Sequence, residues 1–184
     1  MTDDELIDDA LAGRSASFGQ LVLKYQDRLY TALVHATGSV EDARDAAQDA
    51  FVQAFLKLDS FHRRSSFYTW LYRVAFNAAA GRARRKRPEF SLDGHHEATG
   101  HEPADRGALP TEPLEMRERA GQVRAALDTL PHEYRTVVVL REIDGCDYEQ
   151  ISDILDIPVG TVRSRLHRAR VQLKDRLRPV VQAD

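Results

Sequence analysis

The sequence predicts an all-α fold, in which two small helical domains are joined by a flexible acidic linker. Apolar residues recur at three- and four-residue steps through almost all of the chain outside residues 88–113, which is the periodicity of amphipathic helices. No alternating run of β-branched residues is long enough to predict a sheet. At 184 residues and 42% hydrophobic, the chain can bury one ordinary core or two small ones. We therefore expect domains at 1–87 and 114–184, with 88–113 as the linker.

The first two expected helices are separated by a glycine. A short acidic helix near Asp3 to Ala12 ends at Gly13, and a second helix begins near Ser15 and ends at Gly38. The apolar residues of the second helix fall on one face at helical spacing, and they are Phe18, Leu21, Val22, Tyr25, Leu29 and Leu33. This face is expected to enter the core.

The third expected helix opens at Ser39, where Asp42 follows three residues later as in a capping box. Its expected buried stripe consists of Ala43, Ala47, Ala50, Phe51, Ala54, Phe55 and Leu58. The opposite face is acidic and amide-rich, and it contains Glu41, Asp42, Asp45, Gln48, Asp49 and Gln53. The helix therefore separates an apolar face from a strongly polar one.

The fourth expected helix runs from about Ser66 to Arg87, inside a segment that combines aromatic and basic residues. Residues 61–87 contain six aromatic and eight basic residues and no acidic one. Aromatic faces beside cations suit unpaired nucleic acid, although the aromatics could instead be core and the basic run a solvated helix end. Because Tyr68, Trp70 and Tyr72 are two residues apart, they fan around a helix, and at least one is expected at the surface.

Charge is segregated along the chain, although the net charge is only −3. Residues 1–60 carry five basic against eleven acidic residues, and residues 88–113 carry one against six. Residues 158–178 carry seven basic residues and one acidic residue. Two basic surfaces separated by an acidic connector indicate polyanionic partners, since clustered Lys and Arg attract phosphate backbones whatever the total charge.

The C-terminal domain is expected to contain helices at about 114–130, 131–144, 148–155 and 159–177. Asp147 and Gln150 have the spacing of a capping box, and Pro158 and Gly160 then interrupt the chain. The residues of the last helix that are expected to face the core are Val162, Leu166, Ala169 and Leu173. A short helix, a tight turn and a longer basic helix form the pattern of a helix-turn-helix over residues 148–167.

The second helix of such a motif enters the major groove and reads base edges with its outward side chains. The outward residues here are Thr161, Arg163, Ser164, Arg165, His167 and Arg168. The competing interpretation is an ordinary helical hairpin with a solvated cationic face. Five basic residues lie between Arg163 and Lys174 with no acidic residue among them, and such crowding favours binding to an anion.

Other function classes lack support in the sequence. Cys146 is the only cysteine, so neither an internal disulfide nor a cysteine-rich metal site can form. His95, His96 and His101 lie in the expected linker with no cysteine nearby, and we expect no metal there and no cofactor. No nucleophile, base and orienting group form a recognisable set, so an enzyme is not expected.

The chain is expected to act in the cytoplasm. Its longest apolar run, Val137 to Leu140, is far too short to span a bilayer, so no membrane insertion is expected. Met1 is followed by acidic residues rather than by a basic region and an apolar stretch.

Taken together, the motifs resemble a bacterial RNA polymerase sigma factor of the extracytoplasmic function (ECF) group. The blocks that carry the resemblance are residues 18–32 (FGQLVLKYQDRLYTA), 41–55 (EDARDAAQDAFVQAF), 65–77 (SSFYTWLYRVAFN), 127–142 (LDTLPHEYRTVVVLRE) and the helix-turn-helix. They cover nearly the whole chain in the family's order. The resemblance implies sigma region 2 at 1–87 and sigma region 4 at 114–184.

The resemblance also implies roles for particular residues. Those at the positions that dock on core RNA polymerase are Asp45, Gln48, Asp49, Phe51 and Gln53. Those assigned to reading and melting the −10 promoter element are Arg63, Ser65, Ser66, Phe67, Tyr68, Trp70, Arg73, Asn77, Arg82 and Arg84. The outward residues of the last helix, from Thr161 to Arg168, would read the −35 element.

The partners implied by the resemblance are core RNA polymerase, promoter DNA and an anti-sigma factor that holds the protein inactive. The alternative is a free-standing helix-turn-helix regulator that binds duplex DNA without polymerase. Such a regulator would not need the aromatic and basic segment at 61–87 or the acidic helix before it.

Overall fold

The computed structural model describes residues 1–86 and 114–181, with side chains described over 1–82 and 118–178. The described elements are, in order, α1 (Asp3–Leu11), α2 (Ser15–Thr37), α3 (Val40–Leu56), the 3₁₀ helix η1 (Leu58–Ser60), α4 (Phe67–Lys86), α5 (Leu114–Asp128), α6 (His132–Val138), the π-helical turn η2 (Val139–Ile143), α7 (Tyr148–Leu155) and α8 (Val159–Val181). The all-α fold is therefore confirmed. The expected linker at 88–113 lies outside the described residues.

Local side chains determine where the first helices begin and end. Thr2 and Glu5 form a reciprocal capping box at the start of α1. Gly38 ends α2 in the left-handed conformation, with φ of 72°, which a residue without Cβ adopts at little cost. Ser39 then caps α3 by accepting a hydrogen bond from the Asp42 backbone N–H. The predicted boundary between α2 and α3 is confirmed.

The helices α2, α3 and α4 pack together around large side chains of α2 and α4. Leu21, Leu29, Leu33 and Leu71 are fully buried there. The helix α3 contributes small residues instead, and Ala43, Ala46, Ala50 and Ala54 are all 0% exposed. Alanines on the contact face let the backbone of α3 approach its neighbours closely.

The alanine face of α3 corrects the predicted buried stripe. Ala47 and Phe51 are half-buried, and Phe55 is 47% exposed, with its ring edge against Phe18 at 5.1 Å between centroids. The prediction was wrong at Phe55 because the packing face is centred on the smallest side chains. The larger residues consequently fall on its flank.

The C-terminal half departs from the prediction at one helix. The helix expected over 131–144 is divided into α6 and η2, and the Asp144 N–H donates to the carbonyl of Val139 at 3.0 Å, five residues earlier. Gly145, with φ of 73°, then reverses the chain, and Asp147 and Gln150 form the predicted capping box of α7. This π-helical turn sets the direction in which Asp144 leaves the helix.

The helix-turn-helix is formed by α7 and α8, as the sequence predicts. Val162, Leu166 and Ala169 are buried and Leu173 is half-buried, so the predicted core face of α8 is confirmed. Asp156 ends α7 in the left-handed conformation before the turn.

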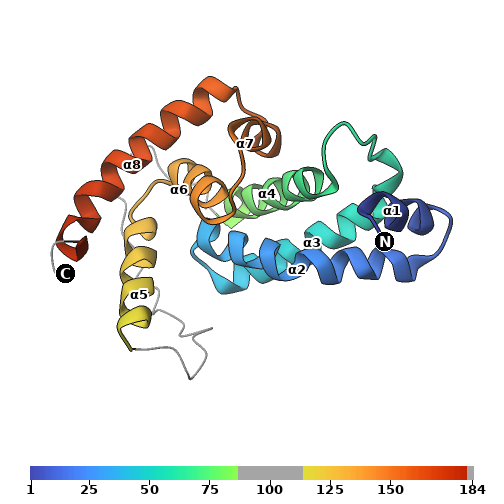
Figure 1. Ribbon diagram of the computed structural model, residues 1–184, viewed down its shortest axis with the longest axis horizontal. Helices are drawn as coiled ribbons and strands as arrows, with labels where there is room; N and C mark the ends of the chain where they lie inside the picture. The colour runs from blue at the N-terminus through green and yellow to red at the C-terminus, as the bar shows by residue number, and fades with distance from the viewer. Residues whose placement is uncertain (87–113, 182–184) are drawn as a thin grey trace.

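The two groups of helices lie against each other. In Figure 1, α7 lies beside α4, and α6 lies over the end of α2. Buried residues of both groups belong to one continuous hydrophobic cluster. Within the described residues, no helix combines the length and apolarity that crossing a bilayer would require.

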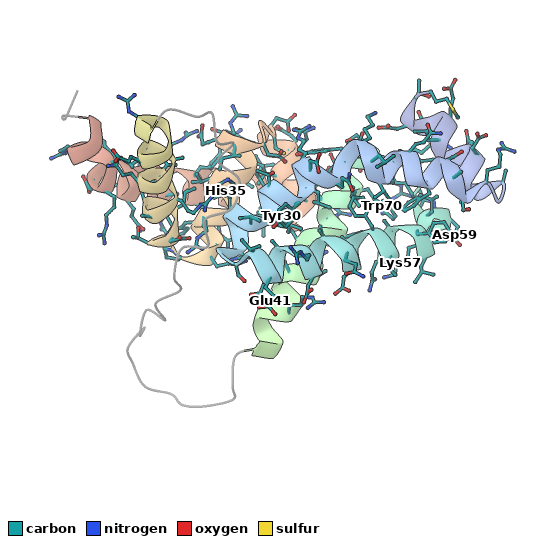
Figure 2. The ribbon with its side chains drawn as sticks, turned by 90° about the horizontal axis from the view of Figure 1, so that it is seen from below. Tyr30, His35, Glu41, Lys57, Asp59 and Trp70 are labelled. Carbon is teal, nitrogen blue, oxygen red and sulfur yellow. The ribbon has the colours of Figure 1, made fainter. Side chains whose placement is uncertain are left out.

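His35 lies where α2 meets the C-terminal helices, and Figure 2 shows it on the part of α2 nearest to them. Its Nδ1 atom is buried without a hydrogen-bond partner among the described residues. Burial first, and then the positive charge of Arg124, lower the pKa of His35, and Asp128 opposes this shift.

A lowered histidine pKa makes the folded state less stable in acid. The unfolded chain takes up a proton as the pH falls through about 6.5, while folded His35 stays neutral until a lower pH, so its stability contribution is complete above that range and falls below it. We expect the thermal midpoint to fall between about pH 7 and 5.5, and His35→Gln to reduce that fall. The control His62→Gln, at an exposed position, should leave it unchanged. An identical pH dependence in His35→Gln and the wild type would contradict the assignment.

Candidate nucleic-acid interface

The outward face of α8 presents most of the predicted base-reading residues to solvent. Arg163, Ser164, His167 and Arg168 are exposed, whereas Thr161 and Arg165 are half-buried. Ser164 donates to the carbonyl of Thr161 at 3.0 Å, which ties its hydroxyl to the first turn. Four of the six predicted residues are therefore accessible to a partner, as the residues of a major-groove reader must be.

Acidic and phenolic groups of neighbouring elements hold several arginines of α8. Arg165 pairs with Glu133 of α6 at 3.0 Å, and Arg170 pairs with Glu142 of η2 at 2.6 Å. Arg168 donates to the hydroxyl of Tyr134 at 3.4 Å. Acidic residues distant in sequence thus reduce the repulsion among the arginines of α8, which have no acidic neighbours within that part of the helix. The same contacts fix the directions in which these arginines extend.

Arg163 has a different environment, because its guanidinium lies over the ring of Tyr148 at 5.9 Å from the ring centroid. Tyr148 is the first residue of α7, and Arg141 lies over the same ring at 5.2 Å. Stacking on an aromatic ring orients a guanidinium while leaving its N–H groups available to acceptors. Arg163 is therefore oriented at the exposed start of α8.

The loop before α4 is held by two helices. Arg63 has a positive φ of 56°, and its guanidinium pairs with Asp8 and, at 3.7 Å, with Asp4 of α1. Ser66 accepts a hydrogen bond from the Thr69 backbone N–H at 3.2 Å, which places it as a cap of α4. The acidic first helix and the cap together shape the loop at 62–66, in which Ser65 is half-buried.

The aromatic residues of α4 divide between the surface and the core. Trp70 is half-buried and lies 5.2 Å from Phe61 and 5.8 Å from Phe67, measured between ring centroids. The rings of Tyr68 and Tyr72 pack against each other in a tilted arrangement, at 4.1 Å between centroids, and both residues are buried. The prediction that at least one of these three residues reaches the surface is confirmed for Trp70. Asn77 is exposed further along α4.

Two of the predicted −10 residues are engaged by the C-terminal half. The Tyr68 hydroxyl donates to Asp144 and lies 3.1 Å from the Cys146 sulfur. Arg73 donates through Nε to the carbonyl of Asp153 at 2.6 Å. Burial, followed by the hydrogen bond to Asp144, raises the pKa of Tyr68. In this arrangement the predicted −10 surface is partly covered.

Arg82 connects two predicted sites that the sequence treats as separate. Its guanidinium pairs with Asp45 at 2.9 Å and with Asp49 at 2.6 Å, both on α3. The hydrogen bond to Asp49 raises the pKa of Arg82 most strongly. The side chain of Arg84 lies outside the described residues. Arg82 therefore ties α4 to the acidic face of α3, where it partly neutralises that face.

The polar face of α3 continues into an exposed apolar patch. Gln48 and Gln53 are exposed, and Val52, Phe55 and Leu56 are 53%, 47% and 72% exposed. We name these last three residues the α3 apolar patch. The helical periodicity did not predict this patch, because it places Phe55 in the core. The sequence contains one indication of this exposure, because α3 has more apolar residues than a single alanine-lined contact face can bury.

Among the described residues, no group of three or more histidine, cysteine, aspartate or glutamate side chains could hold a metal ion. The histidines considered from the sequence, His95, His96 and His101, lie outside the described residues.

Comparison with known proteins shows two matched regions. Residues 21–89 match the Sigma-70 region 2 family, and residues 120–173 match the Sigma-70 region 4 family. The chain is 38% identical to the ECF RNA polymerase sigma factor SigW of Bacillus subtilis, over 90% of this chain and 91% of SigW. It is also 38% identical to the ECF RNA polymerase sigma-E factor of Escherichia coli K12, over 98% of this chain and 97% of that protein.

Solved structures share the fold. CnrH in complex with the cytosolic domain of CnrY superposes with a TM-score of 0.68 at 27% identity, covering 99% of this chain and 98% of CnrH. The sigma factor RpoE of Bartonella quintana, in complex with the anti-sigma factor NepR, has a TM-score of 0.66 at 24% identity, with 88% and 96% coverage.

The contacts of Arg63 generate a prediction about the loop at 62–66. In the double variant Asp4→Asn/Asp8→Asn the guanidinium loses both charged partners, so we expect trypsin to cleave after Arg63 or Arg64 roughly twofold to fivefold faster, since exposed ion pairs contribute little individually. Mass spectrometry of timed digests locates the cleavage. Asp27→Asn removes an exposed carboxylate of α2 and serves as the control. Equal cleavage rates in all three proteins would show that α1 does not hold the loop.

Proposed function

The chain belongs to the ECF group of RNA polymerase sigma factors, and from this membership we propose how its surfaces divide the work of initiation. The protein binds core RNA polymerase through α3 and directs it to promoters. The face of α8 reads the −35 element as duplex, while the loop at 62–66 and α4 read and melt the −10 element. We infer that it acts in the cytoplasm, where it contributes recognition rather than catalysis of its own.

The observation that supports this proposal is that one chain carries two differently built surfaces whose chemistry suits nucleic acid. The helix α8 offers exposed, oriented arginines that suit base edges and phosphates of duplex DNA. The helix α4 offers the half-buried Trp70 beside Phe61, with Asn77 exposed, which suits stacked and unpaired bases. A repressor that binds duplex DNA alone requires only the first surface.

Polymerase binding is proposed for the exposed polar face of α3 together with the α3 apolar patch. Gln48 and Gln53 are available for hydrogen bonds, and the patch adds apolar area next to them. Asp45 and Asp49 are only half-exposed and are paired with Arg82, so we assign them to shaping this face as well as to contacting polymerase. Phe51 supports the face from its half-buried position.

An anti-sigma factor is proposed as the inhibitory partner. CnrH was solved with CnrY, and RpoE of Bartonella quintana was solved with the anti-sigma factor NepR. The fold that this chain shares with both proteins supports a partner protein of the same role.

Run-off transcription tests the proposal directly. We expect the full-length protein with core RNA polymerase to yield a discrete transcript from genomic templates, and core enzyme alone to yield none. If the protein binds duplex DNA but produces no transcript from any template, the free-standing regulator replaces the proposed function.

If α4 opens the promoter and α8 binds the −35 duplex, substitutions in the two helices should impair different activities. Trp70→Ala should reduce promoter opening about tenfold, because a base stacked on an aromatic side chain contributes about 1–3 kcal/mol. Asn77→Ala removes an exposed amide of the same helix and should reduce opening in the same direction. Permanganate footprinting measures the opening, and gel shift with −35 duplex should show little change. Arg163→Ala is the converse variant, which should weaken duplex binding by about 1–3 kcal/mol. Equal loss of both activities in every variant would contradict separate roles.

A further inference from the structure

The first turn of α6 holds two arginines of the predicted −35 reading face. Glu133 pairs with Arg165 at 3.0 Å, and the hydroxyl of Tyr134 accepts a hydrogen bond from Nη1 of Arg168 at 3.4 Å. Glu133 and Tyr134 are consecutive on α6, and the two arginines are three residues apart on α8, so both pairs lie within one turn of each helix. Helix α6 therefore shapes the reading face although the sequence predicts no DNA contact from it.

The two arginines are held in different ways. The Arg165 side chain is only 26% exposed and is bound by a carboxylate, whereas Arg168 is an exposed residue bound by a phenol hydroxyl. A carboxylate neutralises the guanidinium that it binds. A hydroxyl takes up a single N–H and leaves the positive charge and the other N–H groups available. Arg165 is thus withheld from other acceptors, while Arg168 is oriented and remains available to them.

The Tyr134 side chain is itself held in place. Its ring is half-buried and packs against the hydrophobic core, to which Val137 of the same helix also belongs. On α8, Leu166 and Ala169 flank Arg168 within the sequence and are buried. Packing on both helices therefore sets where the Tyr134 hydroxyl lies, as is required of a side chain that orients another.

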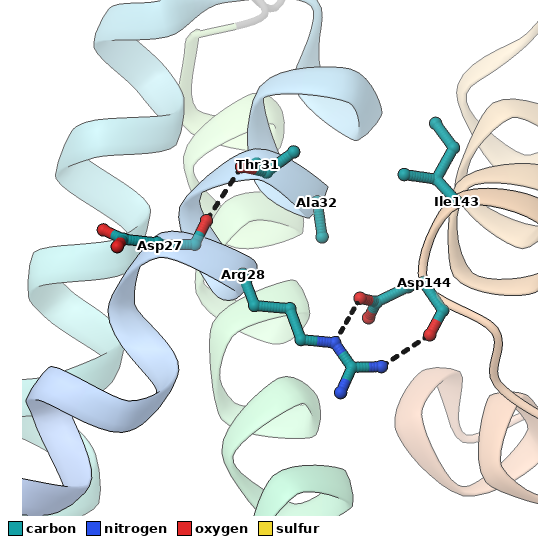
Figure 3. Close-up of a pocket in the computed structure, with 6 residues that line it drawn as sticks. All are labelled: Asp27, Arg28, Thr31, Ala32, Ile143 and Asp144. Atoms are coloured by element: carbon teal, nitrogen blue, oxygen red, sulfur yellow. Dashed lines mark hydrogen bonds and ion pairs between the residues drawn. The ribbon is translucent and has the colours of Figure 1, made fainter.

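The acidic residues at this end of the chain have different partners. Glu142 of η2 pairs with Arg170, which lies beyond the predicted reading residues. Asp144, which follows η2, binds Arg28 of α2 instead of α8 (Figure 3). Among the described acidic residues of α6 and η2, Glu133 is therefore the one that pairs with the predicted reading face.

Restraining one arginine and orienting another both affect specificity, which is the difference between affinity for the correct sequence and affinity for other sequences. A guanidinium that is free to reach backbone phosphates raises the affinity for every sequence. A guanidinium held towards the base edges favours the base whose acceptors it meets. The first turn of α6 combines a restraint of the first kind with an orienting contact of the second.

We propose that Glu133 and Tyr134 are positioning residues that determine specificity for the −35 element. Glu133 keeps Arg165 away from backbone phosphates, and Tyr134 orients Arg168 towards a base edge. The inference rests on the proposed function of α8. It also changes the role of Arg165 from a base-reading residue to a restrained cation.

Selection from a randomised promoter library tests the role of Tyr134. Holoenzyme assembled from core RNA polymerase and the full-length protein binds duplexes randomised over the −35 element, and the bound fragments are sequenced. Arg168→Ala identifies the base pair that Arg168 reads, because the preference at that position is lost. We expect Tyr134→Phe, which keeps the ring and removes the hydroxyl, to reduce the preference at the same base pair about threefold to tenfold, a part of what a whole bidentate contact contributes.

The pattern of the loss decides the role of Tyr134. A merely structural role would weaken binding to all sequences alike and leave the base preferences unchanged. The inference is overturned if Tyr134→Phe changes no preference, if it lowers all positions equally, or if Arg168→Ala itself affects no single position.

The salt dependence of binding tests the role of Glu133. The probe is a fluorescent duplex of unrelated sequence, titrated with the full-length protein at several salt concentrations. Glu133→Gln frees Arg165 for one more phosphate contact, so we expect the slope of log affinity against log salt concentration to steepen by about 0.9. Adding Arg165→Gln to this variant should return the slope to the wild-type value.

The matched control is Glu149→Gln, which removes an exposed carboxylate from α7 that forms no ion pair within the described residues. It should leave the slope unchanged, and an equal steepening would reduce the effect of Glu133→Gln to a general change of charge. If Glu133→Gln does not fold by circular dichroism, Arg165→Gln alone decides. A withheld Arg165 contributes nothing to the slope, so a shallower slope in this variant would show that Glu133 does not restrain it.

The wild-type selection distinguishes failure of the inference from failure of the proposed function. If wild-type holoenzyme enriches a −35 sequence and the variants of α6 enrich it with the same preferences, positioning by α6 is wrong and the sigma-factor role stands. If wild type enriches no sequence and initiates on no template, the proposed function fails first.

Discussion

The burial of the Asp144 carboxylate is the constraint on which the arrangement of the two halves depends. An ionised group that is 5% exposed must be paired, and its partners come from α2 and α4, more than seventy residues away in sequence. The π-helical turn before Asp144 and the positive φ of Gly145 after it are the local structures that deliver the carboxylate to this place. The position of the helix-turn-helix relative to the first four helices therefore depends on this buried carboxylate, on the hydrogen bond from Arg73 to the Asp153 carbonyl and on the apolar cluster that the two halves share.

Elsewhere in the molecule, acidic and phenolic side chains also bind arginines and set their directions. The arginines of α8 are directed by Glu133, Tyr134 and Glu142, Arg82 is directed by two aspartates of α3, and Arg63 is directed by two of α1. These pairs lie at or near the surface, where each adds little stability, so their main effect is to orient side chains. A net charge near zero is in this way compatible with two cationic surfaces, because many of the acids are placed to hold arginines in position.

Much of the fold follows from patterns that act over a few residues. The breaks at Gly13 and Gly38, the cap at Ser39 and the capping box at Asp147 all appear where the sequence predicts them, because each depends on neighbours within four positions. The helix-turn-helix is equally local. Two predictions were wrong because tertiary packing determines the result. Phe55 is exposed, since alanines form the contact face of α3, and the helix expected over 131–144 changes to a π-helical turn.

The sequence by itself determined that the chain is helical, that α8 presents a basic outward face, and that the motifs follow the order of sigma regions 2 and 4. It did so because helical periodicity, capping and motif order are properties of residues near one another along the chain. Only the tertiary structure decided which of these residues are open to a partner. Tyr68 and Arg73 carry the right chemistry in the right segment, yet Asp144 and the carbonyl of Asp153 engage them. Long-range hydrogen bonds leave no trace in local sequence pattern, and this is the physical reason that the engagement of Tyr68 and Arg73 is visible only in the folded chain.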